Sequence, residues 1–321
     1  MRDVRTPFSW LAERWQPSSA MIRRAALAAL VMSVVIVVTG GAVRLSASGL
    51  GCRTWPTCTG ESITPTPEMG LHGKIEFTNR VLTYVLCAAV GWAILAARCA
   101  VPWRRSLTRL GWAQFWVVMS NAVLGGITVL VGLNPYVVGA HMLAALALVW
   151  IAVLTWERAK EGDGPVRQLV AEPLRRLGQL LVGVTGLLVV AGTLVTGAGH
   201  HPGDSNKVPR ITWLSYDRLT QVHADLVFAT IGLSLAVIFA LAAAKAPAPA
   251  RARARELFLV LLAQGVIGYV QYFTDAPEVL VGVHMLGATL VWIAALRIPL
   301  ALRTRDPLPA AALPAQETVA A

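Results

Sequence analysis

Eight long apolar runs divide the chain, and each is long enough to cross a membrane as a helix. A helix rises about 1.5 Å per residue and the hydrocarbon core of a bilayer is about 30 Å thick, so a span needs roughly 20 apolar residues. With 56% hydrophobic and only 14% charged residues, the composition is that of an all-α membrane protein. The first run has no small-residue cleavage site behind it, so we expect a retained helix. The runs cover residues 22–43, 75–97, 108–131, 136–156, 177–197, 218–243, 256–273 and 279–300.

The basic residues predict the orientation of these spans. The formal net charge is +11, but the Lys and Arg residues lie in short clusters between apolar runs, so we expect no nucleic-acid partner. Of the 28 basic residues, 21 lie in the N-terminal arm (1–21) and the first turn of the span that follows it, in every second connection and near the C-terminus. The excess of basic residues in cytoplasmic loops then places both termini in the cytoplasm of a cell-membrane protein. The tail (301–321) is rich in Ala and Pro, and we expect it to be disordered.

A repeat divides the spans into two halves. The sequence V-G-A-H-M-L at residues 138–143 is matched by V-G-V-H-M-L at 281–286, an offset of 143 residues. Gly125 and Gly268 share this offset, and Asn79 falls opposite His223 at an offset of 144. Because four spans separate the repeats, both halves have the same orientation. We therefore predict two four-helix bundles, 22–156 and 177–300, related by a pseudo-twofold axis along the membrane normal.

Three histidines, His141, His223 and His284, lie about five residues inside spans that enter from the outer side. A neutral imidazole in hydrocarbon needs a partner, which can be a hydroxyl or a carbonyl of a neighbouring helix. A repeated histidine facing a bundle interior favours a metal or haem ligand instead. The chain has no Cys-x-x-Cys, no His-x-x-x-His and no carboxylate cluster, which argues against zinc and di-iron sites. We therefore predict that His223 and His284 are the axial ligands of a six-coordinate haem.

The first half carries a carboxylate that the second half lacks. Its second span opens with the sequence H-G-K-I-E-F-T-N-R, from His72 to Arg80, and Glu76 is the one acid in this outer region. Glu76 can pair with Arg80 or Lys74, or it can act as a catalytic or charge-stabilising group. The second half has Thr220 at the equivalent position, an asymmetry that favours the functional interpretation.

The first outer loop holds two cysteines, Cys52 and Cys58, close enough in sequence to form a disulfide on the oxidising side of the membrane. Two free thiols are the alternative. Cys87 and Cys99 lie in or just after the second span and are expected to be ordinary apolar side chains.

Together these motifs resemble the haem A synthase family over nearly the whole chain. They are the outer loop S-G-L-G-C…W-P-x-C, the E-x-x-N-R start of the second span, where the family pattern is E-x-x-H-R, and the histidines opening the fourth, sixth and eighth spans. The resemblance implies oxidation of a methyl group of haem O, the substrate of the first half, to the formyl group of haem A. It also implies a haem b cofactor on His223 and His284 and a Cys52–Cys58 disulfide. The implied partners are the haem O-forming farnesyltransferase and cytochrome oxidase assembly factors, and a homo-oligomer is left open.

One position departs from the family pattern, because Asn79 stands where the family has histidine. His72 lies seven residues earlier, about 10 Å further out along the helix, and could replace that ligand only if the helix start unwinds or the haem tilts. Alternatively, His141 alone holds the substrate iron and leaves an open position. We expect His141 to be the ligand, with Asn79 and Arg80 beside the substrate haem and the role of His72 open.

Three other classes fit less well. A membrane b-type cytochrome that only carries electrons would need the histidines but not Glu76 or the cysteine loop. A thiol-oxidising membrane protein would need a Cys-x-x-Cys or a second cysteine pair. A haem-farnesylating transferase would need paired aspartates for magnesium diphosphate, and the sequence contains neither Asp-x-x-Asp nor Asp-x-x-x-Asp.

Overall fold

The computed structural model describes residues 7–205 and 208–306, and this part of the chain contains eight helices long and apolar enough to cross a membrane. The predicted number of spans is therefore confirmed, and each predicted run falls on one helix. A short helix, α1 (Pro7–Arg14), precedes them. The eight helices are α2 (Ser19–Leu45), α3 (Gly70–Arg98), α4 (Arg105–Leu130), α5 (Pro135–Arg158), α6 (Glu172–Ala198), α7 (Tyr216–Ala243), α8 (Ala248–Phe273) and α9 (Glu278–Ala301).

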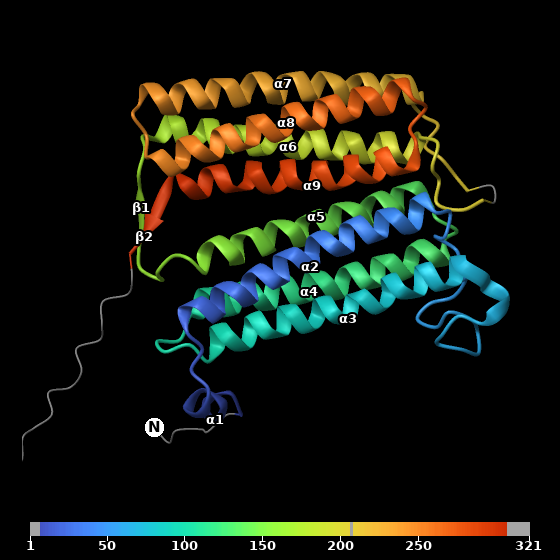
Figure 1. Ribbon diagram of the computed structural model, residues 1–321, viewed down its shortest axis with the longest axis horizontal. Coiled ribbons are helices and arrows are strands. Elements are labelled where there is room, and N and C mark those ends of the chain that lie inside the picture. The colour runs from blue at the N-terminus through green and yellow to red at the C-terminus, as the bar shows by residue number, and fades with distance from the viewer. Residues whose placement is uncertain (1–6, 206–207, 307–321) are drawn as a thin grey trace, which may run out of the picture.

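The helices form two groups of four, which lie one above the other in Figure 1. Helices α2, α3, α4 and α5 pack in a ring, each against the next, and α5 closes the ring against α2. Helices α6 to α9 form a second ring with the same order of neighbours. Helices α2 and α5 contact α9, and α5 also contacts α6, so these helices join the two bundles. The matching order is consistent with the predicted pseudo-twofold axis.

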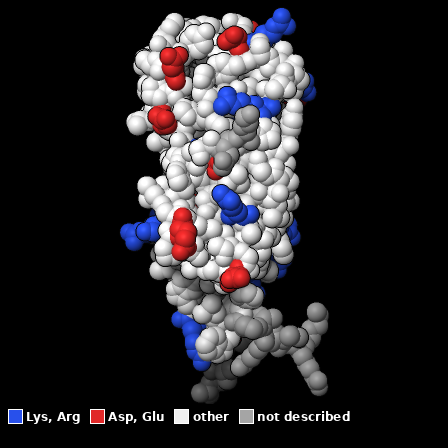
Figure 2. Space-filling model, turned by 90° about the vertical axis from the view of Figure 1, so that its right-hand side faces the viewer, with Lys and Arg blue, Asp and Glu red and all other residues white. Residues whose placement is uncertain are grey.

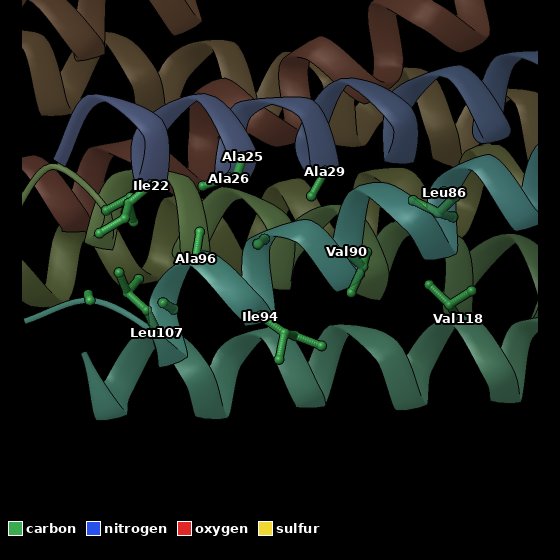
Figure 3. Close-up of a cluster of buried hydrophobic side chains, with 14 of the residues drawn as sticks. Ile22, Ala25, Ala26, Ala29, Leu86, Val90, Ile94, Ala96, Leu107 and Val118 are labelled. Carbon is green, nitrogen blue, oxygen red and sulfur yellow. The ribbon is translucent and has the colours of Figure 1, made fainter. Parts of the chain in front are cut away.

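Small residues let the helices of the first bundle approach closely at the end that carries the chain termini. Ala25, Ala26 and Ala29 of α2 are almost fully buried against Leu86 and Val90 of α3. Figure 3 shows these side chains lying between α2, α3 and α4. Because lipid tails are as apolar as the side chains, such close packing, rather than water exclusion, holds membrane helices together.

The connections divide cleanly between the two ends of the molecule. The loops α2–α3, α4–α5, α6–α7 and α8–α9 lie at one end, which we call the outer end, and the described terminal segments lie at the other (Figure 1). Figure 2 views the outer end, where charged side chains of both signs are scattered over a mostly uncharged surface. Such a surface contrasts with the basic connections of the opposite end, here called the inner end.

Two short strands correct the expectation of a disordered tail from residue 301. Helix α9 continues to Ala301, and β2 (Arg303–Arg305) pairs antiparallel with β1 (Val166–Gln168) in the α5–α6 connection. The strand pairing is extended by a hydrogen bond from Arg305 Nη1 to the Gly164 carbonyl (3.2 Å). These bonds satisfy backbone groups that a disordered tail would leave to water. Residues 307–321 of the predicted tail and residues 1–6 of the N-terminal arm lie outside the described residues.

Helix α8 begins eight residues before the predicted span at 256. Its first two turns carry Arg251, Arg253 and Arg255, which hydropathy assigns to a loop. A helix continues past the bilayer wherever its backbone hydrogen bonds are maintained, so hydropathy marks the membrane-embedded length and not the helix end.

Buried ion pairs connect the bundles at the inner end. The Arg297 guanidinium on α9 donates to Glu157 of α5 and to Glu256 of α8, both at 2.8 Å. Only 9% of the Arg297 side chain is exposed. Its fork of N–H groups therefore joins three helices from both bundles at one point.

Candidate functional site

Two histidines of the second bundle face each other from diagonal helices. His223 lies on α7 and His284 on α9, each within the first two turns from the outer end. Their ring centres are 6.5 Å apart and their planes are inclined by 63°. Two imidazoles bound to opposite sides of one iron, through metal–nitrogen bonds of about 2 Å, would have ring centres roughly 6 Å apart. The observed spacing therefore fits an iron between the two rings.

A glycine on the preceding helix makes room for each ring. A β-carbon on Gly192 of α6 would lie 3.0 Å from Cε1 of His223, and one on Gly268 of α8 would lie 3.1 Å from Cε1 of His284. Either distance is tighter than ordinary van der Waals contact. Each imidazole thus occupies space that a larger residue on the neighbouring helix would fill.

Hydrogen bonding orients these side chains. Nδ1 of His223 lies 3.2 Å from the carbonyl oxygen of Leu188. A histidine that donates from Nδ1 to a carbonyl leaves Nε2 free for a metal, which is the usual arrangement of metal-bound imidazoles. Nδ1 of His284 is buried and has no hydrogen-bond partner among the described residues, whereas its backbone carbonyl accepts from Gln264 (2.7 Å).

His141 of the first bundle has the same surroundings. It lies in the second turn of α5, and a β-carbon on Gly125 of α4 would lie 3.0 Å from its Cε1. Its Nδ1 is buried and makes no hydrogen bond of ordinary geometry within the described ranges, although the ring interacts with the backbone of Asn121 on α4. Three histidines therefore lie near the outer ends of their helices, each against a glycine, as the repeat predicted for His141 and His284.

Asn79 on α3 hydrogen-bonds a hydroxyl of the neighbouring helix, unlike the three histidines. Its amide oxygen lies 2.7 Å from the hydroxyl of Thr39 on α2. His72, the alternative ligand proposed from the sequence, is exposed near the start of α3, and its Nδ1 lies 3.0 Å from the Ser48 hydroxyl of the outer loop. The structure thus gives His72 a partner in the loop.

Glu76 is buried, with 6% of its surface exposed, and both carboxylate oxygens are occupied. The backbone N–H of Cys52 donates to Oε2 at 2.5 Å, and Nη2 of Arg80 donates to Oε1 at 2.5 Å. The predicted alternative of an ion pair with Arg80 is therefore present, whereas within the described chain no ion pair joins Glu76 to Lys74. Glu76 and Arg80 together hold the outer loop on α3.

Arg80 also holds the part of the loop between the cysteines. Its Nη1 donates to the carbonyls of Thr54 and Thr57, each at 3.1 Å, and Cys52 and Cys58 are joined by a disulfide. Trp55 lies between these anchors. Its ring packs on Gly126 of α4, where a β-carbon would lie 2.3 Å from Cδ2.

Trp55 was not among the site residues predicted from the sequence. Gly126 directly follows Gly125, which faces His141, so Trp55 lies on the helix that borders the His141 site. Two features of the sequence could have indicated this contact. They are the adjacent glycines Gly125 and Gly126 of α4 and the single tryptophan between Cys52 and Cys58.

These donors fit haem better than a bare metal ion. No three His, Cys, Asp or Glu side chains converge on a metal-sized site in residues 7–205 and 208–306. An iron bound by one or two imidazoles would need its remaining ligands from a macrocycle, which a haem supplies. The 6.5 Å spacing of the His223 and His284 ring centres is consistent with such a group between α7 and α9.

Comparison with known proteins gives a family and several relatives. Residues 23–202 match the COX15-CtaA family, described as cytochrome oxidase assembly protein. A protein of Methylobacterium radiotolerans named "Heme A synthase" is 26% identical over 168 residues, covering 49% of this chain and 45% of that protein. A "Heme A synthase" of Bacillus pumilus is 29% identical over 148 residues, covering 42% and 46%.

A protein of Thermus thermophilus named "Protoheme IX farnesyltransferase" is 30% identical over 193 residues, covering 53% of this chain and 30% of that protein. The chain spans about half the length of the first two relatives.

Proposed function

The chain belongs to the COX15-CtaA family of cytochrome oxidase assembly proteins, and on that basis we propose that it oxidises a methyl group of haem O to the formyl group of haem A. The reaction takes place in the cell membrane, with both chain termini in the cytoplasm and the histidine sites toward the outer face. The product serves terminal cytochrome oxidases. The haem O-forming farnesyltransferase and oxidase assembly factors are the proposed partners, because they supply the substrate and use the product.

The observation that carries this proposal is the difference between the two bundles. The second has two histidines with ring centres 6.5 Å apart and no acid at the position of Glu76. The first has His141, a buried carboxylate and a loop held over the outer end of its helices. A protein that only carries electrons needs no buried carboxylate at a haem site, whereas one that oxidises a haem can use such a charge beside its substrate.

In the second bundle, we propose that His223 and His284 bind a resident haem b. Haem b with two imidazole ligands supplies one-electron transfer, which is the outlet that successive two-electron oxidations of a methyl group require. Gly192 and Gly268 keep the space that the two rings occupy, and the Leu188 carbonyl orients His223.

In the first bundle, we propose that His141 holds the iron of the substrate haem O, beside Asn79 and Arg80. Glu76 acts as a fixed negative charge near the outer end, where it favours positive charge that develops next to the porphyrin ring during oxidation. Arg80 and the Cys52 N–H hold this carboxylate in place. The Cys52–Cys58 loop and Trp55 cover α4 on that side and exclude water.

The experiment is haem extraction from cells that make haem O and express the protein. We expect haem A from the wild type. Glu76→Gln should lower haem A about a hundredfold or more and keep haem b, because one preorganised charge contributes roughly 3–4 kcal/mol to a barrier. Glu172→Gln is the matched control, because Glu172 pairs with Arg176 at the same helical spacing but is exposed at the start of α6.

Three results separate the alternatives. Haem b without any haem A from the wild type would favour the electron-carrying cytochrome and refute the synthase. Normal haem A from Glu76→Gln would leave Glu76 as the partner of Arg80 only. New farnesylated haem from protohaem would instead favour the transferase named among the relatives, although the chain lacks the paired aspartates which that chemistry needs.

A further inference from the structure

Four positions on α4 face the interior of the first bundle. They recur at intervals of four, three and four residues, the spacing of one helix face, and they are Gln114, Val118, Asn121 and Gly125. Gly125 faces the His141 ring. Gln114 is fully buried, and its Nε2 lies 3.4 Å from Oγ of Ser33 on the diagonal helix α2. Asn121 lies between these two contacts, on the same inward face.

The Asn121 side chain lies beside His141 and lacks a hydrogen bond. The His141 ring interacts with the Asn121 backbone and packs on Gly125, one turn further out. Only 8% of Asn121 is exposed, and its amide oxygen is buried without a partner. No other hydrogen bond joins this side chain to a described residue, so the amide lacks a partner whichever way its oxygen and nitrogen are placed. Because a buried unpaired amide is costly, the arrangement points to a ligand that pairs with it.

The second bundle uses the equivalent amide differently. At the offset of 143 residues, Asn121 corresponds to Gln264 of α8. Gln264 is one methylene longer, and its NH₂ group donates to the backbone carbonyl of His284 at 2.7 Å. Its amide oxygen has no partner, but it packs so closely on Gly287 of α9 that a β-carbon there would have no room. Gln264 thus joins two helices, whereas the shorter Asn121 makes no such side-chain bond within the described chain.

The charge of a haem determines which of its edges reaches Asn121. Its two carboxylates favour the water-facing side, here the outer end, so the opposite edge faces the membrane centre. Asn121 lies about 6 Å closer to the membrane centre than Gly125, on the side of that edge. The same edge carries the substituent that distinguishes haem O, because a hydroxyl-bearing carbon with the farnesyl chain replaces a vinyl group of protohaem. A hydroxyl can donate to an amide oxygen and accept from an amide NH₂.

We propose that Asn121 hydrogen-bonds the hydroxyl of the hydroxyalkyl substituent of haem O and thereby selects haem O over protohaem. This inference rests on the proposed haem O binding of the first bundle and adds a specificity-determining residue to it. Protohaem has no hydroxyl at this position and would leave the buried amide unpaired, which lowers its affinity for the site.

The probes are haematohaem and mesohaem, which carry hydroxyethyl and ethyl groups where protohaem has its two vinyl groups. Neither has a farnesyl chain, so they differ only in the hydroxyls. Each is titrated into purified protein that retains its resident haem, and binding is followed by the Soret absorbance. The part of the signal that His141→Ala removes belongs to the first bundle.

The measured quantity is the ratio of the haematohaem affinity to the mesohaem affinity at this site. Asn121→Leu should lower this ratio roughly tenfold relative to the wild type, which is the effect of one buried hydrogen bond. The comparison between variants cancels the different hydration of the two probes. Asn121→Ala removes the same amide with less bulk and gives the same test where the leucine variant fails to fold.

Gln114→Leu is the matched control. It removes an amide from the same face of α4, about 10 Å further from the outer end than Asn121. Leucine is the residue at the repeat-related position, Leu257, where it is fully buried. The affinity ratio should therefore stay at its wild-type value.

Three results would overturn the inference. They are an unchanged ratio in both Asn121 variants, an equal fall in Gln114→Leu, or titration signals that His141→Ala leaves intact, because no haem would then lie beside Asn121. Failure of the proposed reaction gives a different pattern, since the ratio would depend on Asn121 while haems extracted from cells contained no haem A.

Discussion

The ring of Trp55 lies against Gly126 so closely that a β-carbon at Gly126 would be 2.3 Å from Cδ2 of the indole. The outer loop reaches α4 at this contact, next to the glycine that faces His141. We expect Gly126→Ala to push the indole away and to cost about 1–3 kcal/mol, the usual range for overpacking a close contact. Two measurements would report the change. One is the fluorescence of Trp55 in a variant whose other tryptophans are replaced, and the other is the yield of haem A.

Gly91→Ala is the control for this substitution, because a β-carbon on Gly91 of α3 meets nothing within 4 Å. It changes the same residue type in the same bundle and should leave both measurements near wild type. If Gly126→Ala leaves the fluorescence and the haem A yield as they are in Gly91→Ala, the contact has no role in placing the loop.

A second prediction concerns haem retention. His223→Ala or His284→Ala should remove most of the low-spin haem b spectrum from purified protein, because each side chain would supply one axial bond. His200→Ala is the control, since His200 stacks edge-on with Tyr216 near the same end of the bundle and lies outside the ring pair. A full low-spin spectrum in both His223→Ala and His284→Ala would contradict the assignment.

A third prediction concerns the four cysteines. Labelling of denatured, unreduced protein should mark Cys87 and Cys99 and spare Cys52 and Cys58. In the native protein, Cys99 is fully buried and its burial raises the pKa of the thiol, so its labelling should be slow near neutral pH and faster as the pH rises. Four labelled cysteines in the denatured sample would show that the loop is not closed by a disulfide.

The sequence was sufficient to predict the number and order of the membrane-spanning helices, because hydropathy directly reflects the length of chain that must lie in lipid. It placed the start of α8 late, since Arg251 and its neighbours belong to a helix that extends beyond the apolar run. The strand pairing of Arg303–Arg305 also escaped prediction, because three residues carry too little pattern to distinguish a strand from a disordered tail.

For the candidate site, the histidines and Glu76 could be selected from the sequence because polar groups are rare in membrane spans. Trp55 could not, because its importance comes from what it contacts on another helix. The hydrogen bond between Thr39 and Asn79 likewise joins two helices, and the spacing of these residues in the sequence carries no signal. Packing between distant segments was the missing information.

The last prediction concerns the inner end, where Arg297 joins the two bundles through Glu157 and Glu256. Glu157 and Glu256 keep Lys160 and Arg253 as partners, so removing Arg297 costs its two charged hydrogen bonds, about 1.5–3 kcal/mol, rather than leaving a bare buried charge. Arg297→Gln should therefore lower the midpoint of thermal unfolding in detergent.

Arg176→Gln is the matched control, because the Arg176–Glu172 pair has side chains 76% and 55% exposed, against 9% and 18% for Arg297 and Glu157. Exposed pairs contribute at most about 1 kcal/mol, so this control should unfold like the wild type. Because the histidine sites are at the other end, Arg297→Gln should keep its haem below the unfolding midpoint. Equal midpoints for the two variants would show that Arg297 does not hold the bundles together.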